Sequence, residues 1–151
     1  MIKIGVIGAG GNTISAHLPK LIDQKDVEVI AVANRTISSG NKVAKKFNIK
    51  HVYSDWQEVI MNDEVDAICI GTWPYMHATI SIEALESGKH VLTEARMAMD
   101  SDEAEAMFNV SKNYPELITQ IVPAPHTLPY DKTIKNWVAN EMGDLIFFDV
   151  K

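Results

Sequence analysis

The sequence opens with Met1-Ile-Lys-Ile-Gly-Val-Ile-Gly-Ala-Gly-Gly-Asn-Thr-Ile14, which carries the clearest indication of the fold. An apolar, β-branched run ends in the glycines Gly8, Gly10 and Gly11, and from Ile14 onward the apolar residues recur at helical spacing. A buried strand, a glycine turn and a helix together form the opening of a dinucleotide-binding βαβ unit. A glycine turn with a purely structural role would have the same pattern, so only the rest of the chain distinguishes a cofactor-binding turn from a structural one.

Each position of this glycine pattern has a physical role. Gly8 permits the tight turn because it carries no Cβ. Gly10 lets the backbone approach a pyrophosphate, whose charge would meet N–H groups and the positive end of the helix dipole. Thr13 occupies the third position, where Gly or Ala is usual, so we expect strand and helix to lie slightly further apart there. Asn12 and Ile14 complete the set predicted to surround the pyrophosphate.

The composition excludes several classes of protein. The chain has 151 residues, a net charge of −6 and 46% hydrophobic residues, which is typical of one globular domain and unfavourable for binding nucleic acid. No apolar stretch reaches the length of about 18 residues that spans a membrane. The one cysteine, Cys69, lies in an apolar run, so we expect it to pack in the core. A chain without a disulfide framework fits a cytoplasmic location.

Apolar strand patterns alternate with helical patterns along the chain. This alternation predicts an α/β fold, a doubly wound parallel sheet with helices on both faces. A capping box at Ser54–Glu58 begins one helix, and the helix over Ser101–Asn113 is amphipathic through Ala104, Met107, Phe108 and Val110. The predicted strands after the first cover 26–33, 51–53, 66–71, 90–93 and 117–122.

The end of the chain does not fit this plan. Three prolines between 123 and 129 make a stiff connector, 131–140 reads as a helix, and 143–150 reads as one more strand. A last strand with no following partner leaves apolar side chains and both edges uncovered. We therefore expect a Rossmann domain over 1–122, and over 123–151 the connector, helix and first strand of an absent second α/β domain. That strand is expected to pair with a neighbour, which makes a homo-oligomer.

Several landmarks occur together in order along the whole chain. They are Gly8-Ala-Gly10 with His17-Leu-Pro19, Ala31-Val-Ala-Asn-Arg35, Gly71-Thr-Trp-Pro74 with His77, Ala84-Leu-Glu-Ser-Gly-Lys-His-Val-Leu92 with Glu94, and Gly143-Asp-Leu-Ile146. With them the chain resembles the N-terminal domain of the Gfo/Idh/MocA family of glucose-fructose oxidoreductases and inositol dehydrogenases. The resemblance implies NAD(P)-dependent hydride transfer on a sugar, inositol or related polyol. It also implies a second domain that carries the family's catalytic Asp and His.

One departure from the family concerns the end of the fifth strand. The family has Glu-Lys-Pro there, and its lysine lies beside the nicotinamide, whereas this chain has Glu94-Ala95-Arg96. Ala95 has neither a donor nor a charge and cannot replace that lysine. Arg96 could bind an anionic or hydroxylated substrate but would be a poor proton donor, because it stays charged. A surface or helix-capping arginine is the alternative to this catalytic-site role.

The end of the second predicted strand should face the adenosine ribose. Asn34, Arg35 and Thr36 lie there, and none of them is the acidic residue that selects NAD through the 2′-OH. Arg35 can pair with a 2′-phosphate or stack on adenine, or it can lie free on the surface. The sequence therefore favours NADP over NAD.

Further cofactor contacts are expected after the fourth and fifth strands. Thr72, Trp73 and Pro74 follow the fourth strand at the point where doubly wound sheets bind ligands. Trp73 either shields the cofactor or packs in the core. His77 matches the family's histidine at the start of the helix that follows, and it is expected to orient the cofactor loop and not to act as a general base. Glu94 and Ala95 complete the set. His17 and His90 are interpreted as structural or surface residues. No metal-ligand spacing and no nucleophile elbow occur in the sequence.

Three interpretations follow from these patterns. The chain is the cofactor half of a longer oxidoreductase, a non-catalytic nucleotide-binding sensor or scaffold, or a truncated product of a longer gene. The missing lysine and the missing second domain favour the sensor or scaffold. In all three, the chain alone is expected not to catalyse a reaction, because no acid–base group is placed for it.

Overall fold

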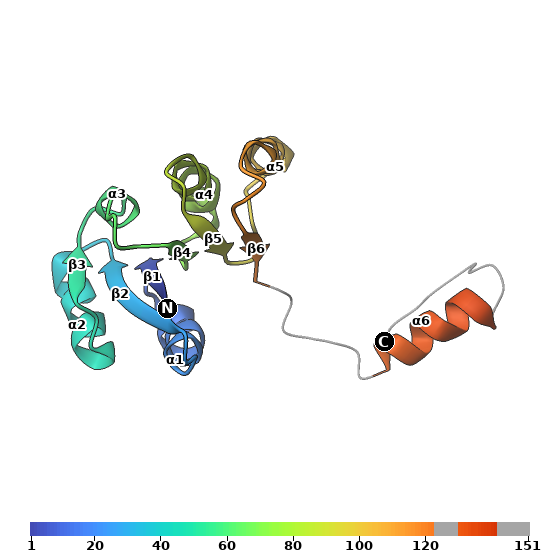
Figure 1. The fold of residues 1–151 in the computed structure, drawn as a ribbon, viewed down its shortest axis with the longest axis horizontal. Coiled ribbons are helices and arrows are strands. Elements are labelled where there is room, and N and C mark those ends of the chain that lie inside the picture. The colour runs from blue at the N-terminus through green and yellow to red at the C-terminus, as the bar shows by residue number, and fades with distance from the viewer. Residues whose placement is uncertain (123–129, 142–151) are drawn as a thin grey trace.

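The computed structural model describes residues 1–122 and 130–141. Within these ranges six parallel strands form one sheet in the order β3-β2-β1-β4-β5-β6 (Figure 1). Successive strands are added on one side of β1 up to β3 and on its other side from β4 onward, which confirms the predicted doubly wound topology. The strands are β1 (Ile2–Ile7), β2 (Val27–Ala33), β3 (His51–Tyr53), β4 (Ala67–Ile70), β5 (His90–Thr93) and β6 (Thr119–Ile121).

Helices cover both faces of the sheet. Figure 1 shows α1 and α2 on one face and α3, α4 and α5 on the other. The helical segments are η1 (Thr13–His17), α1 (Leu18–Ile22), α2 (Ile37–Phe47), α3 (Gln57–Ile60), η2 (Pro74–Met76), α4 (His77–Glu86), α5 (Ser101–Asn113) and α6 (Asp131–Asn140). The bounds of β3, β5, α5 and α6 agree with the sequence predictions.

The core lies in two layers, one on each side of the central strands. Val6 on β1 pairs with Val32 on β2 and with Cys69 on β4, and all three belong to the layer beneath α1 and α2. Ile7 and Ile70 belong to the opposite layer, beneath α3 and α4. Because both faces of β1 are covered, its apolar residues run without the alternation of a half-exposed strand.

The structure corrects three local predictions. Helix α3 has no side-chain cap from Ser54; instead Asp55 Oδ1 accepts a hydrogen bond of 3.0 Å from the Gln57 N–H. Strand β6 is shorter than the predicted 117–122, because only three of its residues pair with β5. Phe108 is 56% exposed although Met107 beside it is buried, so the phenylalanine does not pack in the core. The predicted strand over 143–150 lies outside the described residues.

Candidate functional site

A turn at the carboxyl end of β1 forms the centre of the candidate site. The Gly8 N–H donates to the Ala33 carbonyl at 2.9 Å, which ties the turn to β2. Gly8 has φ of +85°, and a Cβ added there would lie 2.8 Å from the backbone nitrogen of Thr72. A residue with a side chain would therefore be both strained and in collision with β4's loop, so the fold requires glycine at this position.

The next glycines leave space beside this turn. A Cβ added to Gly10 or Gly11 would meet no atom within 4 Å. The Ile14 N–H donates to the Gly10 carbonyl at 2.9 Å, so the chain enters its helical segment directly. The backbone at Gly10 thus faces open space at the switch point of the sheet, where a ligand can approach it closely.

Thr13 packs tightly at the third position of the glycine pattern. Its side chain is buried, and its hydroxyl donates a hydrogen bond of 3.0 Å to the Gly8 carbonyl. A Cβ added to Gly71 would collide with that hydroxyl. The chain therefore accommodates the larger residue by placing a second glycine opposite it and by satisfying the hydroxyl within the turn.

The residues after β2 differ in their surroundings. Asn34 Oδ1 accepts a hydrogen bond of 2.7 Å from the Ala9 N–H, so this side chain is directed into the glycine turn. Arg35 and Thr36 are exposed. The Thr36 hydroxyl accepts from the Ser39 N–H at 3.3 Å and caps α2. Of these residues, Arg35 presents a charge at the end of β2.

The loop after β4 contains three predicted site residues, which differ in their surroundings. Thr72 lies against Gly8, and its buried hydroxyl has no hydrogen-bond partner among the residues described. Trp73 is 74% exposed, so the alternative that it packs in the core is wrong. Pro74 begins η2, as a first-turn proline should.

His77 links the loops that follow β4 and β5. It is 1% exposed, its Nδ1 lies 2.8 Å from the Arg96 carbonyl, and its Nε2 lies 3.0 Å from the Thr72 carbonyl. A carbonyl oxygen only accepts, so a ring nitrogen that hydrogen-bonds to one of these carbonyls does so as an N–H donor. Both ring nitrogens thus face backbone carbonyls, one in the loop after β4 and one in the segment after β5.

A polar cluster formed by Asn12, His17 and Glu94 was not foreseen. The Asn12 side-chain amide donates to Glu94 Oε1, and His17 Nε2 contacts the same oxygen. The side chains of His17 and Glu94 are 13% and 17% exposed. His17 is therefore not a simple surface residue. The His17-Leu-Pro19 motif was visible in the sequence, but its contact with Glu94 is a long-range one.

The segment after Glu94 is more open. Ala95 and Arg96 are exposed, and the Arg96 side chain is available to a ligand or to solvent. Cys69 lies in the strand below, where burial, with a smaller contribution from the charge of Glu94, raises the pKa of its thiol to about 12. The thiol is therefore protonated and packs as an apolar group, as the sequence predicts.

Neither a cluster of metal ligands nor a membrane-spanning helix occurs within residues 1–122 and 130–141. No group of three or more His, Cys, Asp or Glu side chains in these ranges is arranged to hold a metal ion. None of the helices described there is long and apolar enough to cross a bilayer.

Comparison with known proteins finds relatives among oxidoreductases with a Rossmann fold. The profile of the Gfo/Idh/MocA oxidoreductase family, NAD-binding Rossmann fold, matches residues 2–119. A 4-carboxy-2-hydroxymuconate-6-semialdehyde dehydrogenase of Sphingobium sp. is 32% identical over 111 residues, which are 74% of this chain and 35% of that protein. The scyllo-inositol 2-dehydrogenase (NADP(+)) of Bacillus subtilis is 31% identical over 112 residues, 74% of this chain and 34% of that protein.

A solved structure adds a similarity in three dimensions. The structure of a 3-ketoreductase from Actinomadura kijaniata in complex with NADP and TDP-benzene has a TM-score of 0.73 and 28% identity. The aligned part covers 79% of this chain and 36% of that one. The chain thus spans little more than a third of the length of each of these three proteins.

Proposed function

The chain belongs to the Gfo/Idh/MocA oxidoreductase family, NAD-binding Rossmann fold, and from this membership we propose that it holds a nicotinamide dinucleotide at the carboxyl ends of β1, β2, β4 and β5. The observation that carries the proposal is the open space at Gly10, in the same glycine turn as Gly8, against which Thr72 lies with a buried hydroxyl that has no partner among the described residues. A pyrophosphate or ribose there would fill the space and supply the missing hydrogen bond.

The proposed contacts follow the order of the strands. The glycine turn would hold the pyrophosphate, the residues after β2 the adenosine ribose, and the loops after β4 and β5 the nicotinamide half. When bound, the cofactor accepts or donates a hydride. The residues proposed to contact it are Gly8, Gly10, Asn12, Thr13, Ile14, Asn34, Arg35, Thr36, Thr72, Trp73, Pro74, His77, Glu94 and Ala95.

Titration of the chain with NADPH by calorimetry tests the proposed site. We expect saturable binding of one molecule per chain. Thr72→Val keeps the shape of the side chain and removes its hydroxyl, so it should weaken binding. Thr79→Val changes an exposed threonine on α4 and serves as the matched control. If neither NADPH nor NADH binds, or if the two variants behave alike, the proposed site is wrong.

We propose NADP as the preferred cofactor, because no carboxylate follows β2 and the exposed Arg35 can pair with a 2′-phosphate. The NADP-dependent relative and the NADP complex of the ketoreductase support this preference. Arg35→Ala should weaken NADPH binding more than NADH binding, whereas Lys45→Ala, on the exposed face of α2, should change neither. NADH binding tenfold tighter than NADPH, about 1.4 kcal/mol, would refute the preference.

The reaction proposed for the whole protein is hydride transfer on a sugar, inositol or related polyol. The names of the inositol dehydrogenase and the ketoreductase support this class of substrate. Arg96 is the proposed substrate contact, since its exposed guanidinium suits an anionic or hydroxylated molecule. A steady-state assay of this chain with NADP over a polyol and sugar panel should show no turnover. Turnover that persists in His77→Gln and Arg96→Ala would place the chemistry elsewhere.

A second candidate function is a nucleotide-binding sensor or scaffold without chemistry. Ala95, at the position of the lysine expected from the family resemblance, favours it. Both candidates require cofactor binding, so titration does not separate them. The gene does: a reading frame that continues to the length of the relatives favours the oxidoreductase, and a stop codon after Lys151 favours the sensor.

A further inference from the structure

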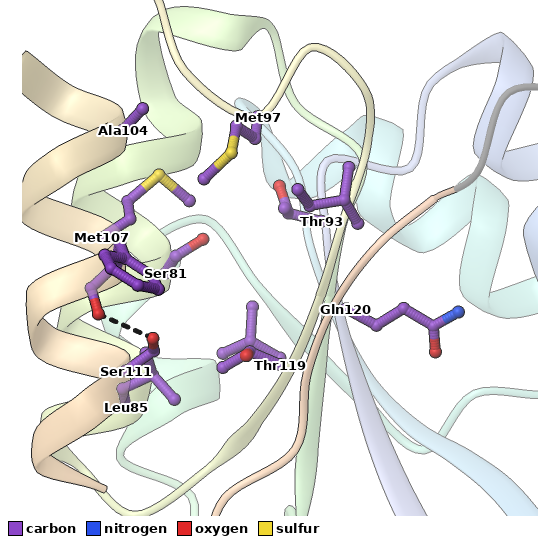
Figure 2. A pocket seen from close by; sticks show the side chains of 12 residues that line it. Ser81, Leu85, Thr93, Met97, Ala104, Met107, Ser111, Thr119 and Gln120 are labelled. Atoms are coloured by element: carbon purple, nitrogen blue, oxygen red, sulfur yellow. Dashed lines mark hydrogen bonds between the residues drawn. The ribbon is translucent and has the colours of Figure 1, made fainter. Parts of the chain in front are cut away.

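A cavity of about 330 Å³ lies between α4, α5 and the strands β5 and β6 (Figure 2). Most of its wall is apolar, formed by Leu85, Val91, Met97, Met107, Phe108 and Ile121. Among the described residues that line it, none carries a charge. The cavity is distinct from the proposed cofactor site. Thr93 lines the cavity, whereas the next residue, Glu94, contacts Asn12 and His17 on the other side of the sheet.

Two buried hydroxyls line this cavity. Ser81 on α4 and Thr93 at the end of β5 are each 2% exposed, and neither Oγ of Ser81 nor Oγ1 of Thr93 has a hydrogen-bond partner in the described structure. Buried polar groups in folded proteins are nearly always paired, so two unpaired hydroxyls on one cavity call for an external partner. Figure 2 shows these residues with Met97 and Met107 around the same space.

Phe108 gives the cavity an approach from solvent. Its side chain lines the cavity and is 56% exposed, and its ring is covered by the Lys112 ammonium, 3.9 Å from the ring centroid. The amphipathic pattern of α5 predicts a buried Phe108, yet its side chain is half-exposed. A molecule bound in the cavity behind the ring would explain this exposure.

We propose that this cavity binds a small, uncharged molecule with an apolar body and one hydrogen-bonding head, such as a cyclic or aromatic alcohol. The head would pair with the Ser81 and Thr93 hydroxyls, and the body would contact the methionines, whose flexible side chains adapt to irregular shapes. A charged ligand is excluded because its charge would be buried without a partner. An apolar cavity of about 150 Å³ binds benzene, so this one has room for about ten non-hydrogen atoms.

Phenol is the probe, and toluene is its control of nearly the same shape without a hydroxyl. In the full chain with labelled methionine methyl groups, phenol should shift the Met97 and Met107 signals saturably. The exposed Met61 should not respond. Toluene should bind at least tenfold more weakly. The Ser81→Ala/Thr93→Val pair should remove this preference, and Ala104→Leu, which fills the cavity, should abolish binding of both probes.

Three results would overturn the proposal. They are shifts of equal size at Met61 and Met97, equal affinity for phenol and toluene, and a phenol preference that survives loss of both hydroxyls. If Ala104→Leu does not fold, Ser111→Leu replaces it from the same helix and the same cavity wall. Phenol–methyl Overhauser effects in the unsubstituted chain decide the location independently of any variant. Their absence at Met97 and Met107 also refutes the site.

Discussion

Replacing single glycines separates the structural requirement at the β1 turn from the space left for a cofactor. In Gly8→Ala, the new Cβ would lie 2.8 Å from Thr72 N and 2.9 Å from the Gly71 carbonyl carbon, and φ is +85°. A left-handed conformation costs a residue with a side chain about 1–2 kcal/mol. Because the clash is with backbone, which cannot rotate away, the loss should exceed that cost. We expect at least about 2 kcal/mol of unfolding free energy.

Gly88→Ala is the matched control for this substitution. Gly88 has φ of +74°, but an added Cβ would meet no atom within 4 Å, so this variant measures the conformational cost without the clash. The difference between the two variants is therefore the steric contribution. Urea unfolding followed by circular dichroism measures both. With a slope of about 2 kcal/mol per molar, Gly8→Ala should lower the midpoint by about 1 M, and Gly88→Ala by less.

Gly10→Ala tests the other half of the argument. Its Cβ would enter open space, so stability should stay the same or rise slightly. The methyl group would occupy the space proposed for the pyrophosphate of the cofactor, so the affinity for NADPH should fall at least tenfold. An unchanged urea midpoint for Gly8→Ala would refute the steric account of the turn. Full NADPH affinity in Gly10→Ala would show that the pyrophosphate does not lie there.

Two further predictions rest on titrating groups. Burial raises the pKa of the Cys69 thiol to about 12, so iodoacetamide at mildly alkaline pH should label the thiol only after unfolding. The contribution of the protonated thiol to the free energy of unfolding should be full below the unfolded pKa of about 8.5 and should decline as the pH rises toward 12. The hydrogen bond from Lys3, helped by the charge of Lys50, lowers the pKa of Glu64; its contribution is therefore present above the unfolded value and lost as pH falls through the folded one. Glu64→Gln should lower the urea midpoint at neutral pH, and a difference that persists in acid below both values would contradict the ion pairs at 3.2 and 3.5 Å.

The sequence predicts the sheet well because its signals are local. Runs such as 29–33 and 67–70 are apolar throughout, since helices cover both faces of a central parallel strand. The helix Ser101–Asn113 carries its own start signal, as Asp100 Oδ1 accepts from the Glu103 N–H at 2.9 Å. At the edge strand β6, pairing on one side alone decides the length, and the residue pattern overestimates it.

The candidate site was only partly predictable, because its contacts join distant parts of the chain. The glycine turn is encoded within a few residues. The contact between His17 and Glu94 joins residues 77 positions apart, and no local spacing reports it. The space that admits Thr13 is likewise created by Gly71, which belongs to a different strand's end. Burial patterns also could not show that Phe108 would line a cavity, since that depends on how α5 packs over β5 and β6.

The arrangement of the titratable groups limits the proton transfer that the proposed cofactor site can support. Both ring nitrogens of His77 face backbone carbonyls, so this histidine has no free position from which to take a proton from a ligand. A guanidinium such as that of Arg96 is a poor proton donor, and the Ala95 side chain has no polar atom. Of the described residues around the glycine turn, His17 and Glu94 remain, and they are in contact with each other. A carboxylate already engaged by an imidazole and by the Asn12 amide is better placed to accept a hydrogen bond from a ribose hydroxyl than to move a substrate proton. We therefore predict that the described residues bind a cofactor and do not by themselves turn over a substrate.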